Sequence, residues 1–335
     1  MASDVLTPRT KGAVLGALLL GSAGFHPAGA TVLTTDASAG IRASDPPYNQ
    51  VNFFYHTPDA TQVAGPPAGQ VLSDSQRTSN GKMRLLGYAT EDGLIGAYAA
   101  TTGSAGVLVD TKIHTTVTAG ADGKLIGTFH FNPFYLALRP TSSIPGTNSA
   151  SWSFSISGGG QEVTAFVGLI EDATATPHPS VFTSGMAESA LNLQESGNGG
   201  LEELSGNIGT LTLDFGFRKA GESFDLDYDM MAGARTFEDA SPGTAGGGQD
   251  ACMDPVPPLN PICFITPFAI ASGSDPFAFG NSADASGFLA GERARFGEPA
   301  ISFTIRPAIA VSEPGTIGLL GAGLVSLGLR RRGRA

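Results

Sequence analysis

The residues with the clearest potential for chemistry are four aspartates in two neighbouring runs of alternating sequence. Asp225, Asp227 and Asp229 are two positions apart, so in a β-strand their side chains project from one face. A hairpin with its turn at residues 219–222 would place Asp214 opposite Asp227 on that face. Oxygen ligands grouped in this way could hold Ca²⁺, which accepts about six to eight of them. The sequence favours the alternative, a solvated acidic face neutralised by Arg218, Lys219 and salt.

Other ionisable side chains give weaker indications of chemistry. His114 and His130 lie on the two arms of a second expected hairpin, where a matching register would allow a metal pair; polar residues at strand edges are the simpler interpretation. Glu162, Glu171 and Asp172 could supply the paired carboxylates of a glycoside hydrolase, but nothing singles them out. The sequence contains no nucleophile-elbow, zinc-protease, Walker or dinucleotide-binding spacing. We therefore predict no catalytic residue and no enzyme activity.

The two cysteines of the chain, Cys252 and Cys263, enclose a proline-rich loop. In an oxidising compartment such a pair is expected to form one disulfide that closes the loop. Neither a Cys-x-x-Cys spacing nor a neighbouring histidine accompanies them, so a catalytic or metal-binding role is the weaker interpretation.

β-Strands must position these residues, because nearly every periodic segment has a period of two. Large apolar residues alternate with polar ones through residues 211–217 and 224–230. Serines alternate with Trp152, Phe154 and Ile156, and we expect these three side chains to point into the core. Around ten such segments, without a regular strand–helix rhythm, predict an all-β fold: an antiparallel β-sandwich, jelly-roll-like.

Exposed aromatic residues would indicate a sugar-binding surface. Tyr48, Phe53, Phe54 and Tyr55 are the candidates, since Trp152 shares its face with core residues. Three of the four are consecutive and cannot all be buried in one sheet face, so at least one is expected to be exposed.

The composition is that of an acidic chain. Its 335 residues include 19 Lys and Arg against 30 Asp and Glu, a net charge of −11. Removal of residues 1–30 and 313–335 would leave 13 basic and 28 acidic residues, a net charge of −15. Such a surface repels nucleic acid and anionic lipid, so we exclude a nucleic-acid partner.

The N-terminal 30 residues have the three parts of a secretory signal peptide. Arg9 and Lys11 precede the 13-residue apolar run of residues 12–24, and Ala28 and Ala30 form an A-x-A cleavage site. Thr31 would then be the first residue of the mature protein.

Residues 311–335 form a three-part block at the other end. A turn-like sequence is followed by the apolar run of residues 315–329 and then by arginines. As a helix this run would be about 22 Å long, short of the ~30 Å hydrocarbon core. The block resembles the PEP-CTERM sorting signal. The matching residues are Ser312, which replaces the usual first proline, Glu313, Pro314 and Gly315, with Arg330, Arg331, Arg332 and Arg334 behind the apolar helix.

The resemblance implies export and processing. In this bacterial family the tail is recognised by exosortase, a membrane-embedded peptidase that cleaves near the Glu-Pro. Exosortase and the Sec export machinery are therefore the expected partners. We expect transient membrane association through the C-terminal helix, followed by release to the cell surface or outside the cell. Phrases spread over residues 84–306 are also similar to secreted PEP-CTERM β-proteins, which implies a fold and no catalytic residues.

These indications predict three parts: a signal peptide (1–30), a β-sandwich mature domain (31–310) and the sorting signal (311–335). The mature domain is expected to be a structural or adhesive protein of the cell surface or of a biofilm's extracellular matrix. The alternatives are a carbohydrate-binding module with an extracellular polysaccharide as partner and, with less support, a secreted glycan hydrolase.

Overall fold

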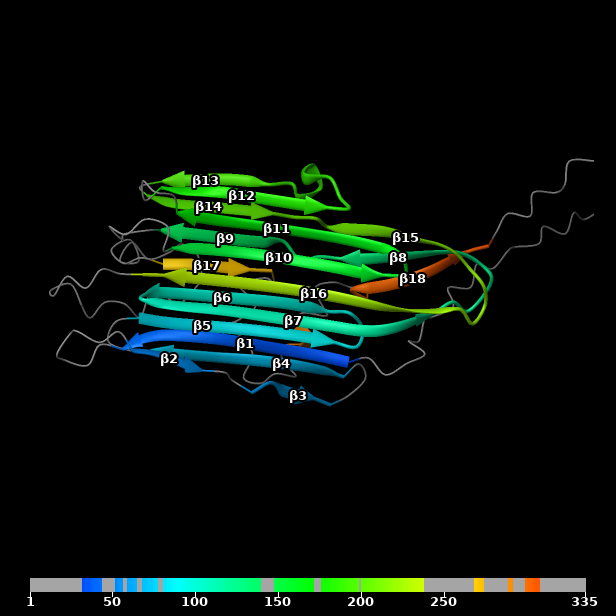
Figure 1. Cartoon of the computed structure of the whole chain (residues 1–335), viewed down its shortest axis with the longest axis horizontal. Coiled ribbons are helices and arrows are strands. Elements are labelled where there is room, and N and C mark those ends of the chain that lie inside the picture. The colour runs from blue at the N-terminus through cyan, green and yellow to red at the C-terminus, as the bar shows by residue number, and fades with distance from the viewer. Residues whose placement is uncertain are drawn as a thin grey trace, which may run out of the picture.

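Almost all of the regular structure in the part of the chain that the structure describes is β-strand. The computed structural model describes residues 32–43, 52–56, 59–64, 68–77, 81–139, 148–171, 176–198, 200–237, 268–273, 289–291 and 299–307. Within these residues eighteen strands, more than the ten or so expected, form three antiparallel sheets. The strands run along the long axis of the molecule (Figure 1). The predicted all-β antiparallel fold is confirmed.

Seven strands form the first layer, which we call sheet A. Their order across the sheet is β12-β11-β10-β16-β7-β1-β2, so half of the neighbouring pairs join strands that are not consecutive in the chain. The strands are β12 (Pro177–Ser184), β11 (Gln161–Glu171), β10 (Ser149–Gly158), β16 (Ser223–Thr236), β7 (Ala105–Thr118), β1 (Val32–Ala43) and β2 (Asn52–His56).

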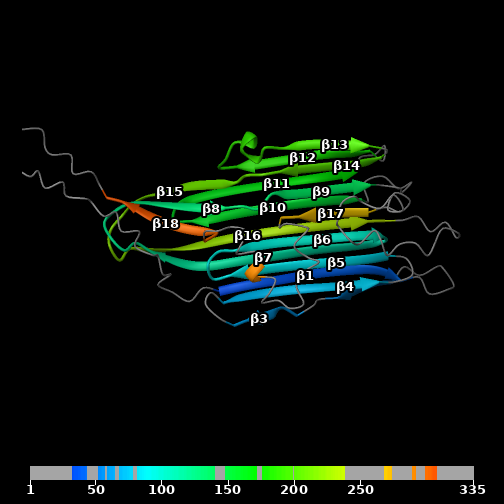
Figure 2. The same ribbon diagram turned by 180° about the vertical axis from the view of Figure 1, so that it is seen from behind.

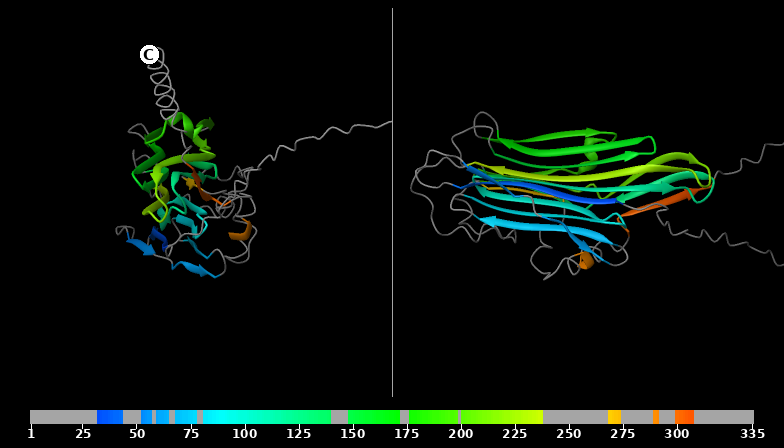
Figure 3. Two further views of the ribbon diagram at one scale, coloured as in Figure 1. Left: turned by 90° about the vertical axis from the view of Figure 1, so that its right-hand side faces the viewer. Right: turned by 60° about the horizontal axis from the view of Figure 1, so that its bottom comes forward.

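Eight strands form the second layer, sheet B, which packs face to face with sheet A (Figure 3). In order across the sheet they are β13 (Gln194–Asn198), β14 (Leu201–Gly206), β9 (Phe134–Arg139), β17 (Phe268–Ser272), β6 (Ile95–Gly103), β5 (Gly81–Thr90), β4 (Gly69–Arg77) and β3 (Thr61–Val63). A short 3₁₀ helix, η1 (Glu188–Leu191), precedes β13.

Sheet C is smaller and lies at one end of the molecule, as Figures 1 and 2 show from opposite sides. Its strands, in order, are β15 (Thr210–Arg218), β8 (Gly123–His130) and β18 (Ile301–Arg306). β8 leads into β9 and β14 leads into β15, each through only three residues. Sheet C therefore continues the line of sheet B past a short break.

Two hairpins expected from the sequence exchange partners in the structure, so both pairings were wrong. β16 pairs with β7 in sheet A, and β15 pairs with β8 in sheet C. The two connections, residues 119–122 and 219–222, bond to each other: the backbone N–H of Ala119 donates to the carbonyl of Glu222 at 2.9 Å, and that of Gly221 donates to Ala119 at 2.8 Å. The chain thus forms one two-stranded ribbon that folds over from sheet A to sheet C.

The main core lies between the sheets. Trp152, Phe154 and Ile156 point inward and are buried, as predicted. The Trp152 ring stacks on Phe134, with centroids 4.4 Å apart and planes at 12°. Alternate residues of β10 therefore supply a large part of the apolar contact between the layers.

The outer faces of the two main sheets differ. A second apolar cluster covers the outer side of sheet B and includes Tyr88, Tyr98 and Leu289. All nine residues of β6 are buried as a result. Along β7 and β16, by contrast, buried and more exposed residues alternate, so the outer face of sheet A is open.

Candidate functional site

Most of the described candidate site residues lie on the outer face of sheet A. Cross-strand partners share a face, so the register defines this surface. Its residues on the four central strands are Glu162, Thr164, Phe166, Gly168 and Ile170 of β11; Ser149, Ser151, Ser153, Ser155 and Ser157 of β10; Asp225, Asp227, Asp229, Met231, Gly233 and Arg235 of β16; and Leu108, Asp110, Lys112, His114 and Thr116 of β7.

Side chains of β7 contact the acidic part of this face. The Thr116 hydroxyl donates to Asp225 at 2.8 Å, and Nδ1 of His114 lies 2.7 Å from Oδ1 of Asp227. This hydrogen bond, assisted by the charges of Asp227 and Asp225, raises the pKa of His114 despite a small opposing effect of burial. The pair is exposed to solvent, where such an interaction contributes little to stability.

The third aspartate of β16 is half-buried. Burial raises the pKa of Asp229; Lys112 opposes the rise, whereas the charges of Asp110 and Asp227 add to it. Ser155 donates a long hydrogen bond of 3.4 Å to its carboxylate. Nζ of Lys112 is 3.0 Å from Asp110. Lys112, Asp110, Asp229 and Asp227 thus form a network of mixed charges, whereas Arg218, named in the sequence interpretation, contacts Glu222 and Gly159 instead.

The fourth aspartate lies apart from the other three. Asp214 belongs to β15 in sheet C, because β15 pairs with β8 and not with β16. Nζ of Lys124 lies 2.6 Å from its carboxylate, and the backbone N–H of Gly216 donates at 3.0 Å. Both contacts lower the pKa of Asp214, Lys124 most strongly. Within the described residues no three His, Cys, Asp or Glu side chains are grouped to hold a metal ion.

The two histidines considered as a metal pair lie in different sheets. His114 is in β7 beside Asp227, whereas Nδ1 of His130 in β8 lies 3.1 Å from the hydroxyl of Thr210. The expected hairpin that would have joined them is replaced by the pairing of β7 with β16.

The carboxylates considered for glycoside hydrolysis are in unlike surroundings. Glu162 is exposed beside Ser157, but Glu171 is buried. Oε2 of Glu171 accepts hydrogen bonds from the backbone and side-chain nitrogens of Asn148 at 3.1 and 2.7 Å, which ties the end of β11 to the start of β10. Asp172 lies outside the described residues.

A row of serines and a group of apolar side chains were not recognised as a site from the sequence. The serines occupy every outward position of β10, and Phe182 of β12 is the register partner of Phe166. The alternation of serine with Trp152, Phe154 and Ile156 was visible in the sequence and fixed the core face. The sequence alone gave no indication of a site on the opposite, serine-bearing face of β10, because the residues that surround the serines come from distant segments.

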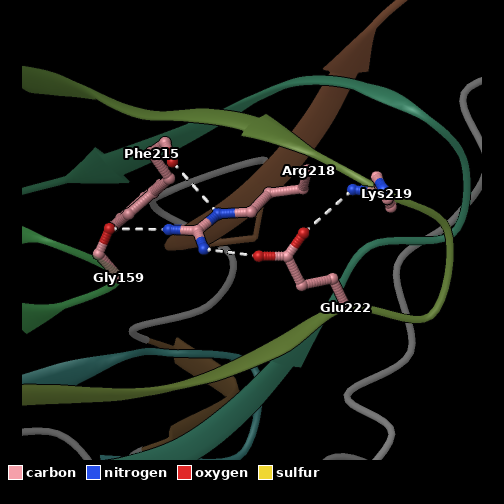
Figure 4. A network of polar contacts seen from close by, with 5 residues as sticks. All are labelled: Gly159, Phe215, Arg218, Lys219 and Glu222. Atoms are coloured by element: carbon pink, nitrogen blue, oxygen red, sulfur yellow. Dashed lines mark hydrogen bonds and ion pairs between the residues drawn. The ribbon is translucent and has the colours of Figure 1, made fainter.

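Arg218 makes the most extensive described polar network at the end of the molecule (Figure 4). Its Nε donates to the carbonyl of Phe215 at 3.1 Å, one terminal nitrogen donates to Gly159 at 2.7 Å, and the other to Glu222 at 2.9 Å. Glu222 in turn accepts from the backbone N–H of Lys219 at 3.1 Å. Each of its three nitrogens thus donates to a protein acceptor, so this arginine serves the structure.

The network joins two sheets. Gly159 belongs to the β10–β11 turn of sheet A, whereas Arg218 ends β15 of sheet C. The guanidinium also lies 5.1 Å from the ring centroid of Phe224 in β16, which packs on Phe215. This contact holds sheet C against the end of sheet A.

Several predicted site residues lie outside the described residues. They are the signal-peptide residues Ala28 and Ala30, the cysteines Cys252 and Cys263, and the sorting residues Ser312, Glu313, Pro314, Gly315, Arg330, Arg331, Arg332 and Arg334. Tyr48 and the apolar C-terminal helix also lie there, and of Phe53, Phe54 and Tyr55 only the backbone in β2 is described. In the described part of the chain no helix is long and apolar enough to cross a bilayer.

Comparison with known families identifies the C-terminal segment as a sorting motif. Residues 310–332 match the family model of the PEP-CTERM protein-sorting motif. The chain carries a PEP-CTERM sorting signal. The resemblance seen in the sequence is thereby confirmed, and the motif implies processing by exosortase and an exported protein of the surface or exterior. No curated protein matches the chain.

Proposed function

We propose that this PEP-CTERM protein is a non-enzymatic, structural or adhesive protein displayed at the cell surface or in the extracellular matrix. The matched sorting motif is the main support for this proposal, because proteins with this motif are exported from the cell. The open outer face of sheet A supports a role in contacts, since the corresponding face of sheet B is covered.

The proposed route uses both ends of the chain. The Sec machinery exports the protein, and residues 1–30 are cleaved off after Ala30. The apolar segment of residues 315–329 holds the protein transiently in the membrane, with the arginines on the cytoplasmic side. Exosortase then cleaves near Glu313 and Pro314, and the mature domain leaves without the tail.

The fold is compatible with cleavage close to the domain. Strand β18 ends at Arg306, seven residues before Glu313. Fully extended, this connection spans at most about 25 Å. The peptidase can therefore act on a tail that leaves an already folded sandwich, with the sheet C end of the molecule nearest the membrane.

Processing is tested by intact mass and cell fractionation. The wild-type protein should be recovered from the surface without residues 1–30 and without the arginine cluster. A Glu313→Ala, Pro314→Ala variant should remain in the membrane fraction with its tail, whereas Ser312→Pro, which restores the usual first proline, should be processed as the wild type is. Full-length wild-type protein stable in the membrane or free in the cytosol would contradict the proposal.

The contact role is tested on whole cells and on the purified protein. Cells that make the unprocessed variant should lose surface cohesion relative to cells with the wild type. A panel of polysaccharides should show no turnover by the purified protein. The burial of Glu171 against Asn148 supports this expectation, because it separates that carboxylate from the exposed Glu162. Turnover abolished by a single carboxylate substitution would instead make the protein a hydrolase.

A further inference from the structure

The row of five serines on β10 presents hydroxyl groups in the middle of sheet A. β10 is paired along its whole length with β11 on one side and β16 on the other, so its backbone is fully engaged. Of these five serines, only Ser155 forms a side-chain hydrogen bond with another described residue, the long bond to Asp229. The hydroxyls of Ser149, Ser151 and Ser157, which are partly exposed, therefore keep donor and acceptor capacity, whereas Ser153 is buried between its neighbours.

Apolar side chains gather on the same face. Of the five exposed large apolar residues in the described part of the chain, four lie here: Leu108, Ile170, Met231 and Phe182, the last 60% exposed. Single exposed apolar residues are ordinary, but their concentration on one face marks a contact surface. Phe182, Phe166, Ser153 and Met231 are successive register partners, so apolar groups flank the middle of the serine row on both sides.

Carboxylates occupy one end of the serine row. Glu162 of β11 and Asp227 of β16 are the two register partners of Ser157, and Asp229 is the partner of Ser155. Lys112 and His114 face only the β7 side of this group, near Asp229 and Asp227. The whole chain carries a net charge of −11. A ligand with positive charge is thus favoured at this end, and an anionic polymer is disfavoured.

These features select among possible occupants. An added peptide strand needs a free sheet edge, and β10 has none. A second copy laid face to face would bring its own Asp225, Asp227 and Asp229 against an equally acidic molecule. A polysaccharide with amino groups suits all three chemistries: hydroxyls for the serines, C–H faces for the apolar side chains, and ammonium groups for the carboxylates.

We propose that the outer face of sheet A binds an amino-sugar polysaccharide along β10. β10 is ten residues long and spans about 33 Å, enough for several sugar rings. The serine hydroxyls bond ring hydroxyls, Phe166, Phe182 and Met231 contact ring faces, and Asp227 with Glu162 receives ammonium groups. The inference deepens the proposed surface role and rests on it for access to such a polymer.

The test measures binding of glucosamine oligomers to the purified protein, with the fully N-acetylated oligomers and alginate as comparison ligands. Phe182→Ala, Ser151→Ala and Asp227→Asn should each weaken binding of the glucosamine oligomers about fivefold. The chain offers matched controls in sheet C: Phe217→Ala removes an aromatic side chain that is 57% exposed, and Asp214→Asn removes an exposed carboxylate that is also paired with a base. Both controls should bind within about twofold of the wild type.

Polylysine serves as the probe for unspecific attraction to an acidic protein. Its binding should be unaffected by Phe182→Ala. The inference is overturned if the acetylated oligomers or alginate bind as tightly as glucosamine oligomers, or if the sheet C controls weaken binding as much as the sheet A variants. Melting curves of each variant show that the comparison is between folded proteins. Polysaccharide binding is measured on the purified protein, whereas surface display of the protein is measured by cell fractionation. Failure of this inference can therefore be distinguished from failure of the proposed function.

Discussion

The joint between sheets C and A depends on Arg218, and its removal should destabilise the fold measurably. The guanidinium is mostly covered, with a side-chain exposure of 19%. Its hydrogen bond to the Gly159 carbonyl spans two sheets at 2.7 Å and, with a charged donor, contributes about 1.5–3 kcal/mol. The pair with Glu222 is exposed and adds little, and the contact with Phe224 adds about 0.5–1 kcal/mol. We expect Arg218→Ala to lower the free energy of unfolding by about 3 kcal/mol.

Urea and thermal unfolding of the purified protein provide the assay. A loss of about 3 kcal/mol corresponds to a fall in Tm of about 6–12 °C for a domain of this size. Arg218→Lys should lose roughly half as much, because an ammonium group cannot serve three acceptors arranged as a fork. Lys219→Ala is the matched control: it removes a neighbouring charge but keeps the backbone donor to Glu222.

Two results would refute this reasoning. Arg218→Ala within about 0.5 kcal/mol of the wild type would mean that the network adds nothing beyond solvation of the same groups. If the Arg218→Lys variant were as stable as the wild type, the positive charge alone would suffice and the forked geometry of the guanidinium would be irrelevant.

Two further predictions concern the pH dependence of stability. The pKa of His114 is raised in the folded protein by Asp227, so its contribution is present below the unfolded value of about 6.5 and is lost as pH rises through the folded pKa. His114→Gln should therefore reduce the difference in urea midpoint between pH 5.5 and pH 8.5, and an unchanged difference would contradict the assignment. The pKa of Asp229 is raised chiefly by burial, so its ionisation opposes folding above the unfolded pKa. Asp229→Asn should raise the urea midpoint at pH 7 but not at pH 3; a lower midpoint at pH 7 would show that Lys112 outweighs burial.

The face on which each residue lies could be predicted from the sequence. Trp152, Phe154 and Ile156 are buried as the alternation indicated, because side chains of a strand alternate between its two sides whatever its neighbours are. The sorting signal could be recognised for a related reason. Its turn, apolar run and arginines are contiguous, so no tertiary contact is needed to assemble the pattern.

The neighbours of each strand could not be predicted in the same way. β15 and β16 are joined by a short turn and both alternate, yet each takes its partner from β7 or β8 about a hundred residues earlier. Asp214 is separated from Asp225, Asp227 and Asp229 for this reason, and the grouping of four carboxylates that local pairing would have given is not assembled. The same exchange of partners separates His114 from His130.

The sequence by itself thus determined the strand periodicity, the core-facing residues of β10 and the C-terminal sorting signal. All three are properties of contiguous residues. The tertiary structure alone decided that the five serines of β10 lie between β11 and β16, and that Arg218 reaches Gly159. The physical reason is that a period of two follows from local backbone sterics. Pairing, in contrast, is chosen by the burial and hydrogen bonding of segments far apart in the chain.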